Sequence, residues 1–211
     1  CGVSAGTPAP PDPDEPERVA AAAAELSWRH IVVTSVTRDD LPDGGASHFA
    51  RTVLALRQRA PAVSVELLVP DFGGGTEALR VVLDAGPDVL AHNVETVPRL
   101  YPMVRRGADY GRSLTLFRRA AAEVPALPLK SGIMVGLGET REEVAAVFRD
   151  LFDAGCRSLT VGQYLPPSRE HLPLAEYVPP ERFDRYAALA REIGFEKVLA
   201  GPLVRSSYKS A

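Results

Sequence analysis

Residues 129–164 read LKSGIMVGLGETREEVAAVFRDLFDAGCRSLTVGQY, and the order of patterns within them decides the fold class. Leu129–Val135 is a short apolar run of the kind that forms a β-strand. Thr140–Ala154 then has the pattern of a helix that ends at Gly155, and Ser158–Tyr164 is a second short strand. A strand, a helix and a strand in this order predict a βαβ unit, in which the two strands run parallel.

The same alternation extends along the rest of the chain, where strands begin roughly every 25–40 residues with helical stretches between them. The other predicted strands are His30–Val36, Val63–Val69, Val89–Val94 and an extended piece at Val198–Leu203. The other predicted helices are Glu15–Leu26, Ala46–Arg59, Thr76–Ala85, Val97–Arg105, Ser113–Val124 and Glu181–Ile193. The β-branched, nearly all apolar run at His30–Val36 indicates a strand buried on both faces. We therefore expect a parallel α/β domain, either a doubly wound sheet or a full or partial (β/α) barrel.

The composition of the 211-residue chain is that of an ordinary globular domain, with 45% hydrophobic and 24% charged residues. Its net charge of −3 argues against a broad nucleic-acid-binding surface, which needs an excess of basic residues. No apolar run approaches the roughly 20 residues that a membrane-spanning helix needs. The two cysteines, Cys1 and Cys156, lie far apart, which excludes a disulfide scaffold and predicts a reducing, cytoplasmic compartment.

Polar side chains recur where five of the predicted strands end, which is where parallel α/β proteins place their functional groups. They include Ser35, Glu66, His92, Asn93, Glu95, Lys130, Ser131, Gln163 and Tyr164. Because polar groups inside buried strands are costly unless they are paired, a whole set of them predicts a shared polar cavity. The alternative is that each side chain is a separately satisfied core group or a helix cap.

A few other residues have local structural interpretations. Thr140 followed by Glu143 predicts a capping box at the start of a helix. His48 is expected to be structural or at the surface, and Cys156 is expected to be a core residue. The sequence contains no Walker phosphate loop, nucleophile-elbow serine or pair of zinc-binding histidines at helical spacing.

Six blocks of the sequence closely resemble the lipoyl synthase family, in the family's order and at its spacing. The blocks are Val32–Ala46, Glu66–Phe72, Ala91–Val97, Lys130–Glu139, Gly162–Leu165 with His171–Pro173, and Gly201–Tyr208. They span essentially the whole chain, and the C-terminal motif Arg205-Ser-Ser-Tyr208 is particular to this family.

The resemblance implies a radical enzyme built on a partial (β/α) barrel of the radical S-adenosylmethionine (SAM) type. Such enzymes use SAM and two 4Fe-4S clusters, a radical-SAM cluster held by a CxxxCxxC loop and an auxiliary cluster. A 5′-deoxyadenosyl radical removes hydrogens from C6 and C8 of a protein-bound octanoyl chain, and the auxiliary cluster supplies two sulfur atoms. The implied partners are an octanoylated lipoyl carrier domain, a low-potential electron donor and an iron–sulfur carrier protein, with neither nucleic acid nor a membrane.

The resemblance also implies cofactor-binding positions. Asn93 and Glu95 are placed for the sugar or amino end of SAM, and Arg112 is placed for its carboxylate, which a planar guanidinium fits well. The other expected cofactor-binding residues are Ser35, Lys130, Gln163 and Tyr164. We divide the chain into a Pro-rich loop at 1–17, the partial barrel at 18–200 and a C-terminal segment at 201–211.

Two cluster ligands are implied in the same way. Cys1 matches the third cysteine of the CxxxCxxC motif, and Ser207, with Ser206 as the alternative, matches a ligand of the auxiliary cluster. The family's first barrel strand and its other cluster cysteines would lie before Cys1, and one cysteine cannot hold a cluster. The chain is therefore expected to be a fragment of a lipoyl synthase that is inactive alone. One alternative is a truncated, inactive paralogue that acts as a binding module. Another is a metal-free acid–base enzyme that uses Lys130 and Glu95 in a closed eight-unit barrel.

Overall fold

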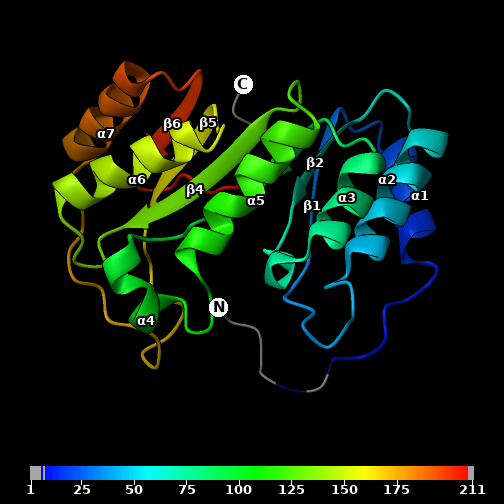
Figure 1. Cartoon of the computed structure of the whole chain (residues 1–211), viewed down its shortest axis with the longest axis horizontal. Helices are drawn as coiled ribbons and strands as arrows, with labels where there is room; N and C mark the ends of the chain where they lie inside the picture. Colours follow the sequence, from blue (N-terminus) through cyan, green and yellow to red (C-terminus); the bar gives the residue numbers. More distant parts are fainter. Residues whose placement is uncertain (1–5, 7, 209–211) are drawn as a thin grey trace.

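A six-stranded parallel sheet forms the centre of the computed structural model, which describes residues 6 and 8–208 (Figure 1). The strands are β1 (His30–Thr34), β2 (Ser64–Leu68), β3 (Val89–Ala91), β4 (Leu129–Val135), β5 (Ser158–Gln163) and β6 (Lys197–Gly201). They are hydrogen-bonded in chain order from β1 to β6. A doubly wound sheet reverses its strand order, so this unbroken order identifies a (β/α) barrel arrangement. Within the described residues β1 and β6 do not pair, so the barrel is partial, which contradicts the closed eight-unit alternative.

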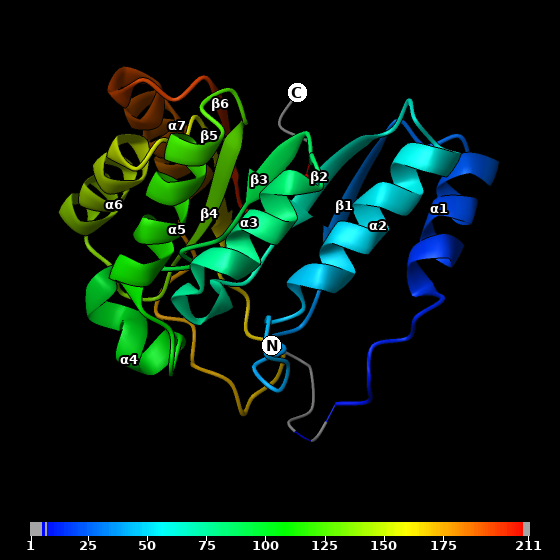
Figure 2. The same ribbon diagram turned by 45° about the vertical axis from the view of Figure 1, so that its right-hand side comes forward.

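The helices cover one face of the curved sheet, the outer face, and all of them except α1, which precedes β1, connect successive strands (Figures 1 and 2). They are α1 (Glu15–Glu25), α2 (Ala46–Arg59), α3 (Thr76–Asp84), α4 (Tyr101–Val104), α5 (Tyr110–Glu123), α6 (Arg141–Asp153) and α7 (Pro180–Ile193), with short 3-10 turns η1 (Phe72–Gly74) and η2 (Pro98–Leu100). Their apolar side chains pack against the sheet in one core, in which Phe117, Phe148 and Phe183 are fully buried. None of the described helices is both long enough and apolar enough to cross a lipid bilayer.

The elements agree closely with those expected from the sequence. α2 and β4 begin and end at the predicted residues, the predicted helix Val97–Arg105 divides into η2 and α4, and the ends of the other elements shift by up to three residues. Among the strands the largest shortening is at β3, which ends at Ala91. After it the chain leaves the sheet and rejoins it only through a single bridge between Glu95 and Ile133.

The expectation that the first strand is buried on both faces is wrong. The side chains of β1 are only partly buried, and Thr34 at its end is exposed. The reason is its place in the sheet, because within the described residues β1 pairs only with β2. Its other edge presents backbone groups that a further strand could pair with.

The local interpretations of three side chains are confirmed. The Thr140 Oγ1 accepts a hydrogen bond from the Glu143 backbone at 3.2 Å, and the Glu143 carboxylate accepts one from the Thr140 backbone at 2.7 Å, which completes the capping box of α6. Cys156 is fully buried in the core, and burial raises the pKa of its thiol. His48 contacts Glu15 at 2.8 Å, which links α2 to α1.

Candidate functional site

A cavity of about 170 Å³ lies beside the ends of β3, β4 and β5, on the face of the sheet that the helices leave open. It is lined by Asn93, Glu95, Gly132, Ile133, Met134, Thr160, Gly162, Gln163, Leu165, Val204, Arg205 and Ser206. Three of the predicted cofactor-binding residues, Asn93, Glu95 and Gln163, therefore share one cavity with a serine of the C-terminal motif. The prediction of a shared polar cavity thus holds for these three of the nine polar residues named at strand ends, and the other six do not line it.

Glu95 reaches this cavity from a strained backbone. Its φ of 64° lies in the left-handed region, which residues with a side chain rarely adopt. Two hydrogen bonds hold the strain in place, because the Glu95 backbone donates to Gly132 at 3.1 Å and accepts from Met134 at 2.8 Å. Burial raises the pKa of the Glu95 carboxyl, while a hydrogen bond from the Asn93 side chain acts in the opposite direction. Backbone strain and a carboxyl with a raised pKa at one residue are typical of a functional site.

The environment of Glu95 predicts a dependence of stability on pH. A carboxyl whose pKa is raised in the folded state releases its proton first in the unfolded state, so it lowers the free energy of unfolding as the pH rises above about 4.3. Glu95→Gln removes this charge, so we expect the variant to melt at a higher temperature than the parent chain at pH 7. At pH 3, where the carboxyl is neutral in both states, the two melting temperatures should converge. A variant that is less stable than the parent at pH 7 would contradict this account.

Glycine at position 132 is what allows the polar groups of the cavity to meet. A Cβ at Gly132 would lie 2.7 Å from Asn93 Oδ1 and 2.8 Å from Thr160 Oγ1, closer than side-chain carbons approach polar atoms. The space that the missing side chain leaves is thus bordered by an amide oxygen and a hydroxyl. These groups can form hydrogen bonds with the hydroxyl or amino groups of a small ligand.

Gln163 lines the cavity, but backbone groups already engage its amide. Its Nε2 donates to the carbonyl oxygens of Val135, Tyr164 and Glu176 at 3.0–3.1 Å, and its Oε1 accepts from the Val178 backbone at 2.9 Å. The side chain therefore anchors the loop between β5 and α7. Its role toward a cofactor stays a prediction.

Lys130 is buried inside the barrel but does not line the cavity. Its Nζ donates to Glu66 Oε1 at 2.8 Å and to the Tyr208 carbonyl oxygen at 2.9 Å. His92, another member of the polar set, points the opposite way, toward α5. Its Nδ1 donates to the Val69 carbonyl oxygen at 2.8 Å, and burial lowers its pKa to about 4. His92 is thus a buried core histidine whose hydrogen bonds are made within the fold. This is the alternative explanation given above for the polar residues at strand ends.

Three predicted cofactor-binding residues lie apart from the cavity. The Arg112 Nε donates to Asp71 Oδ2 at 2.6 Å, and Arg112 does not line the cavity. The Tyr164 hydroxyl donates to the Leu172 carbonyl oxygen at 2.9 Å, and the exposed Ser35 donates to the Val36 carbonyl oxygen at 2.9 Å. The structure does not bring these residues together with Asn93 and Glu95, and their binding roles stay predictions.

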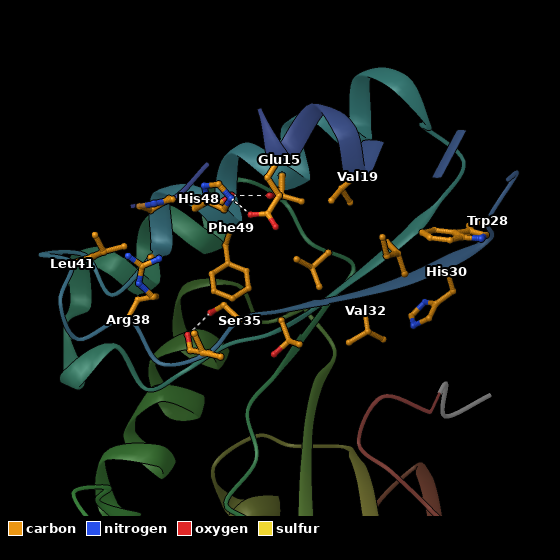
Figure 3. A pocket seen from close by; sticks show the side chains of 17 residues that line it. Glu15, Val19, Trp28, His30, Val32, Ser35, Arg38, Leu41, His48 and Phe49 are labelled. Carbon is orange, nitrogen blue, oxygen red and sulfur yellow. Dashed lines mark hydrogen bonds and ion pairs between the residues drawn. The ribbon is translucent and has the colours of Figure 1, made fainter. Parts of the chain in front are cut away.

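Ser35 lies instead in a larger groove of about 770 Å³ along the open edge of β1, shown in Figure 3. The groove lies between α1, β1 and α2, with Val19, Trp28 and Phe49 among its apolar lining residues. It runs along the free edge of β1, whose backbone N–H and C=O groups pair with no described strand. Polar side chains also line it, among them the paired Glu15 and His48. We interpret it as the space beside an open sheet edge and not as the cofactor site, because it lies apart from Asn93 and Glu95.

The structure describes only one of the two predicted cluster ligands, Cys1 and Ser207. Cys1 lies outside the described residues. Ser207 is exposed, whereas its neighbour Ser206 is partly buried and lines the cavity.

Comparisons with known proteins place the chain in a family. The Radical SAM superfamily profile matches residues 1–151. The lipoyl synthase of Caldanaerobacter subterraneus is 59% identical over 208 residues, an alignment that covers 99% of this chain and 73% of the relative. This chain belongs to the lipoyl synthase family. A second lipoyl synthase, from Methylococcus capsulatus, is 58% identical over 99% of this chain and 65% of the relative. This lipoyl synthase family member therefore spans about two thirds to three quarters of the length of these relatives.

Solved structures support the fold of this lipoyl synthase family member. HydG, a maturase of the FeFe-hydrogenase, matches 88% of this chain and 44% of its own with a TM-score of 0.69 at 17% sequence identity. HemN from Escherichia coli, a coproporphyrinogen III oxidase described as a radical SAM enzyme, matches 86% of this chain and 45% of its own with a TM-score of 0.59. At such low identity these likenesses establish the partial barrel alone.

The described part of this lipoyl synthase family member does not contain a complete set of ligands for an iron–sulfur cluster. Residues 6 and 8–208 hold no group of three histidine, cysteine or acidic side chains that could bind a metal ion. The one cysteine among them, Cys156, is buried in the core and remains protonated because burial raises its pKa. The described residues fit a polar organic cofactor and not a cluster.

Eight of the twelve residues that line the cavity were not predicted as site residues, and three of them, Gly132, Thr160 and Arg205, bring its polar groups together. The first two could have been found from strand periodicity, because Gly132 lies two residues after Lys130 and Thr160 lies two residues before Gly162. Side chains two apart on a strand share a face. No pattern of this kind predicts Arg205, since it reaches the cavity only because the chain turns after β6.

Proposed function

We propose that this chain forms the SAM-binding barrel of a lipoyl synthase. The reaction inserts two sulfur atoms at C6 and C8 of a protein-bound octanoyl chain to give the lipoyl cofactor. Identity of 53–59% to curated lipoyl synthases over essentially the whole chain supports this proposal. The single observation that carries it is the cavity in which Asn93 and Glu95 meet a serine of the C-terminal motif.

The polar groups of the cavity match the polar groups of SAM, which carries an ammonium, a sulfonium, a carboxylate and a ribose diol. The Glu95 carboxylate can accept hydrogen bonds from the ammonium or the diol, and the Asn93 amide can both donate and accept. At about 170 Å³ the cavity is smaller than the roughly 300–1,000 Å³ of whole-ligand sites. It therefore receives one polar end of the cofactor and orients the rest.

SAM, when bound together with the radical-generating cluster, supplies the 5′-deoxyadenosyl radical that removes hydrogen from the octanoyl chain. The contribution of this chain is to hold and orient the cofactor and to exclude water from the barrel. Asn93 and Glu95 hold its polar end. Arg112 is proposed to pair with its carboxylate, although its present partner is Asp71.

Cluster ligands and partners belong to the same proposal. Cys1 is proposed as a ligand of the radical-SAM cluster, and Ser207 or Ser206 as a ligand of the auxiliary cluster. The proposed partners are an octanoylated lipoyl carrier domain, a low-potential electron donor and an iron–sulfur carrier protein. The proposed compartment is the cytoplasm.

A chimera tests this function. This chain replaces the matching segment of the Caldanaerobacter subterraneus lipoyl synthase, and the product is assayed with SAM, a reductant and an octanoylated carrier domain. We expect lipoylated carrier and 5′-deoxyadenosine, detected by mass spectrometry. A chimera that folds and carries its clusters but forms neither product would refute the proposal.

Variants of the chimera test the cofactor site itself. Asn93→Ala and Glu95→Gln should each weaken SAM binding about tenfold or more, the effect of losing one charge-assisted or buried hydrogen bond. Glu77→Gln, which makes the same change at an exposed glutamate of α3, is the matched control and should bind SAM normally. If all these proteins bind SAM with equal affinity, Asn93 and Glu95 do not belong to the SAM site. The SAM affinity of Arg112→Met tests Arg112 in the same way, and weaker binding is the expected result.

A further inference from the structure

The chain does not leave the barrel after β6. Gly201 at the end of β6 pairs with Gly162, whereas Lys197 at its start pairs with Ser158, which is also the partner of Lys130. The carbonyl oxygen of Tyr208 nevertheless contacts Lys130. Residues 202–208, here named the C-terminal strap, therefore run back along the inner face of the sheet, from the level of Gly162 to that of Lys130. Figure 1 shows this red segment passing behind β4, on the face opposite α5.

Lys130 holds the far end of the C-terminal strap. Both Lys130 and its partner Glu66 are almost fully buried, at 1% and 2% exposure, so the ammonium is shielded from water. The ammonium has three donor hydrogens, of which one goes to Glu66 at 2.8 Å and one to the Tyr208 carbonyl oxygen at 2.9 Å. Because lysine is rarely buried unless it is paired, both acceptors fix the position of this charge.

Gly162 admits the near end of the C-terminal strap. A Cβ at Gly162 would overlap the carbonyl oxygen of Val204, so any residue with a side chain would exclude the strap from this path. The same carbonyl oxygen accepts a hydrogen bond from Arg205 Nη1 at 2.7 Å. Ser206 follows directly and faces the cavity that holds Asn93 and Glu95.

We propose that Lys130, fixed by Glu66, is a positioning residue that anchors the C-terminal strap in the barrel and thereby sets where Ser206 and Ser207 lie. A hydroxyl that is to bind a ligand must be held within a few tenths of an ångström, and an exposed segment without secondary structure does not provide that alone. The link to a cluster ligand rests on the proposed function. The anchoring itself is a property of this chain's own contacts.

Hydrogen exchange of the 211-residue chain tests the anchor, with mass spectrometry of peptides that cover residues 202–208. Lys130→Met should raise the exchange rate of the C-terminal strap about tenfold or more, as expected for loss of a charge-assisted hydrogen bond. Lys197→Met, the same change at an exposed lysine of β6, is the matched control and should leave the rate unchanged.

Two further variants separate anchoring from loss of the fold. Glu66→Leu with Lys130→Met removes both buried charges together, so the barrel should stay folded while the C-terminal strap still exchanges about tenfold faster. Gly162→Ala displaces the strap at its other end and should have a similar effect with Lys130 intact. A folded double variant whose strap exchanges at the parental rate would overturn the proposal.

These measurements need neither a cluster nor SAM, so their outcome is separate from that of the chimera. Faster exchange of the C-terminal strap with an inactive chimera would keep the anchor and reject the proposed function. An active chimera together with unchanged exchange in the double variant would support the proposed function and reject the anchor.

Discussion

Lys130→Met alone is expected to lower the free energy of unfolding by about 3–5 kcal/mol, and Glu66→Leu alone by a similar amount. Each change leaves the other charge buried without its partner, and an unpaired charge in a protein interior is among the most destabilising features known. Lys130 Nζ and Glu66 Oε1 lie 2.8 Å apart, and the two residues are only 1% and 2% exposed, so water cannot replace the lost partner. Urea denaturation followed by circular dichroism measures these free energies.

The double variant closes a thermodynamic cycle around this pair. With both charges absent, the free energy of unfolding should return to within about 1 kcal/mol of the parent value, because two apolar side chains of similar volume fill the same space. The remaining deficit reports the lost bond to Tyr208 together with the lost contact between Glu66 and His30, whose Nε2 lies 3.6 Å from Glu66 Oε2. If the double variant is as unstable as the sum of the single ones, Glu66 and Lys130 do not act as a pair.

The parts of the fold that follow from local pattern could be predicted, whereas features set by distant contacts could not. β4 and α6 were predicted because apolar runs, a capping box and Gly155 lie within one stretch of sequence. The premature end of β3 could not be predicted, because it depends on the left-handed conformation of Glu95, which bonds to β4 hold in place. The exposure of β1 depends on what lies beside it in the sheet.

The residues of the candidate site also separate into those that local sequence predicts and those that depend on distant contacts. Asn93 and Glu95 could be predicted as neighbours because they follow one strand, and in parallel sheets the strand ends meet at one edge. The pairing of Lys130 with Glu66 joins residues far apart in sequence, so only the register of three strands, β2, β3 and β4, reveals it. Arg112 was placed by resemblance, and its contact with Asp71 could not be foreseen from the chain order. The chemistry came from the family resemblance, since polar residues at strand ends fit many cofactors.

Gly136→Ala is expected to lower the free energy of unfolding by about 2–5 kcal/mol. The φ of Gly136 is +98°, a conformation that costs a residue with a side chain about 1–2 kcal/mol. In addition, a Cβ at this position would overlap the Gln163 amide and lie 2.6 Å from the Glu176 carbonyl oxygen, and overpacking of this kind costs about 1–3 kcal/mol more. The variant should therefore release the loop that Gln163 anchors, which hydrogen exchange of residues 164–178 will show as faster exchange.

Gly138→Ala is a matched control for this prediction because it separates the two causes. Gly138 has nearly the same φ, +95°, but a Cβ there would meet only the Ala175 side chain at 3.8 Å, an ordinary contact. This variant should lose only the conformational part, about 1–2 kcal/mol, and keep the parental exchange rate in residues 164–178. The difference between the two variants measures how tightly the Gln163 anchor is packed against β4. Equal losses in both would mean that the loop yields to the added methyl group and that the anchor is loose.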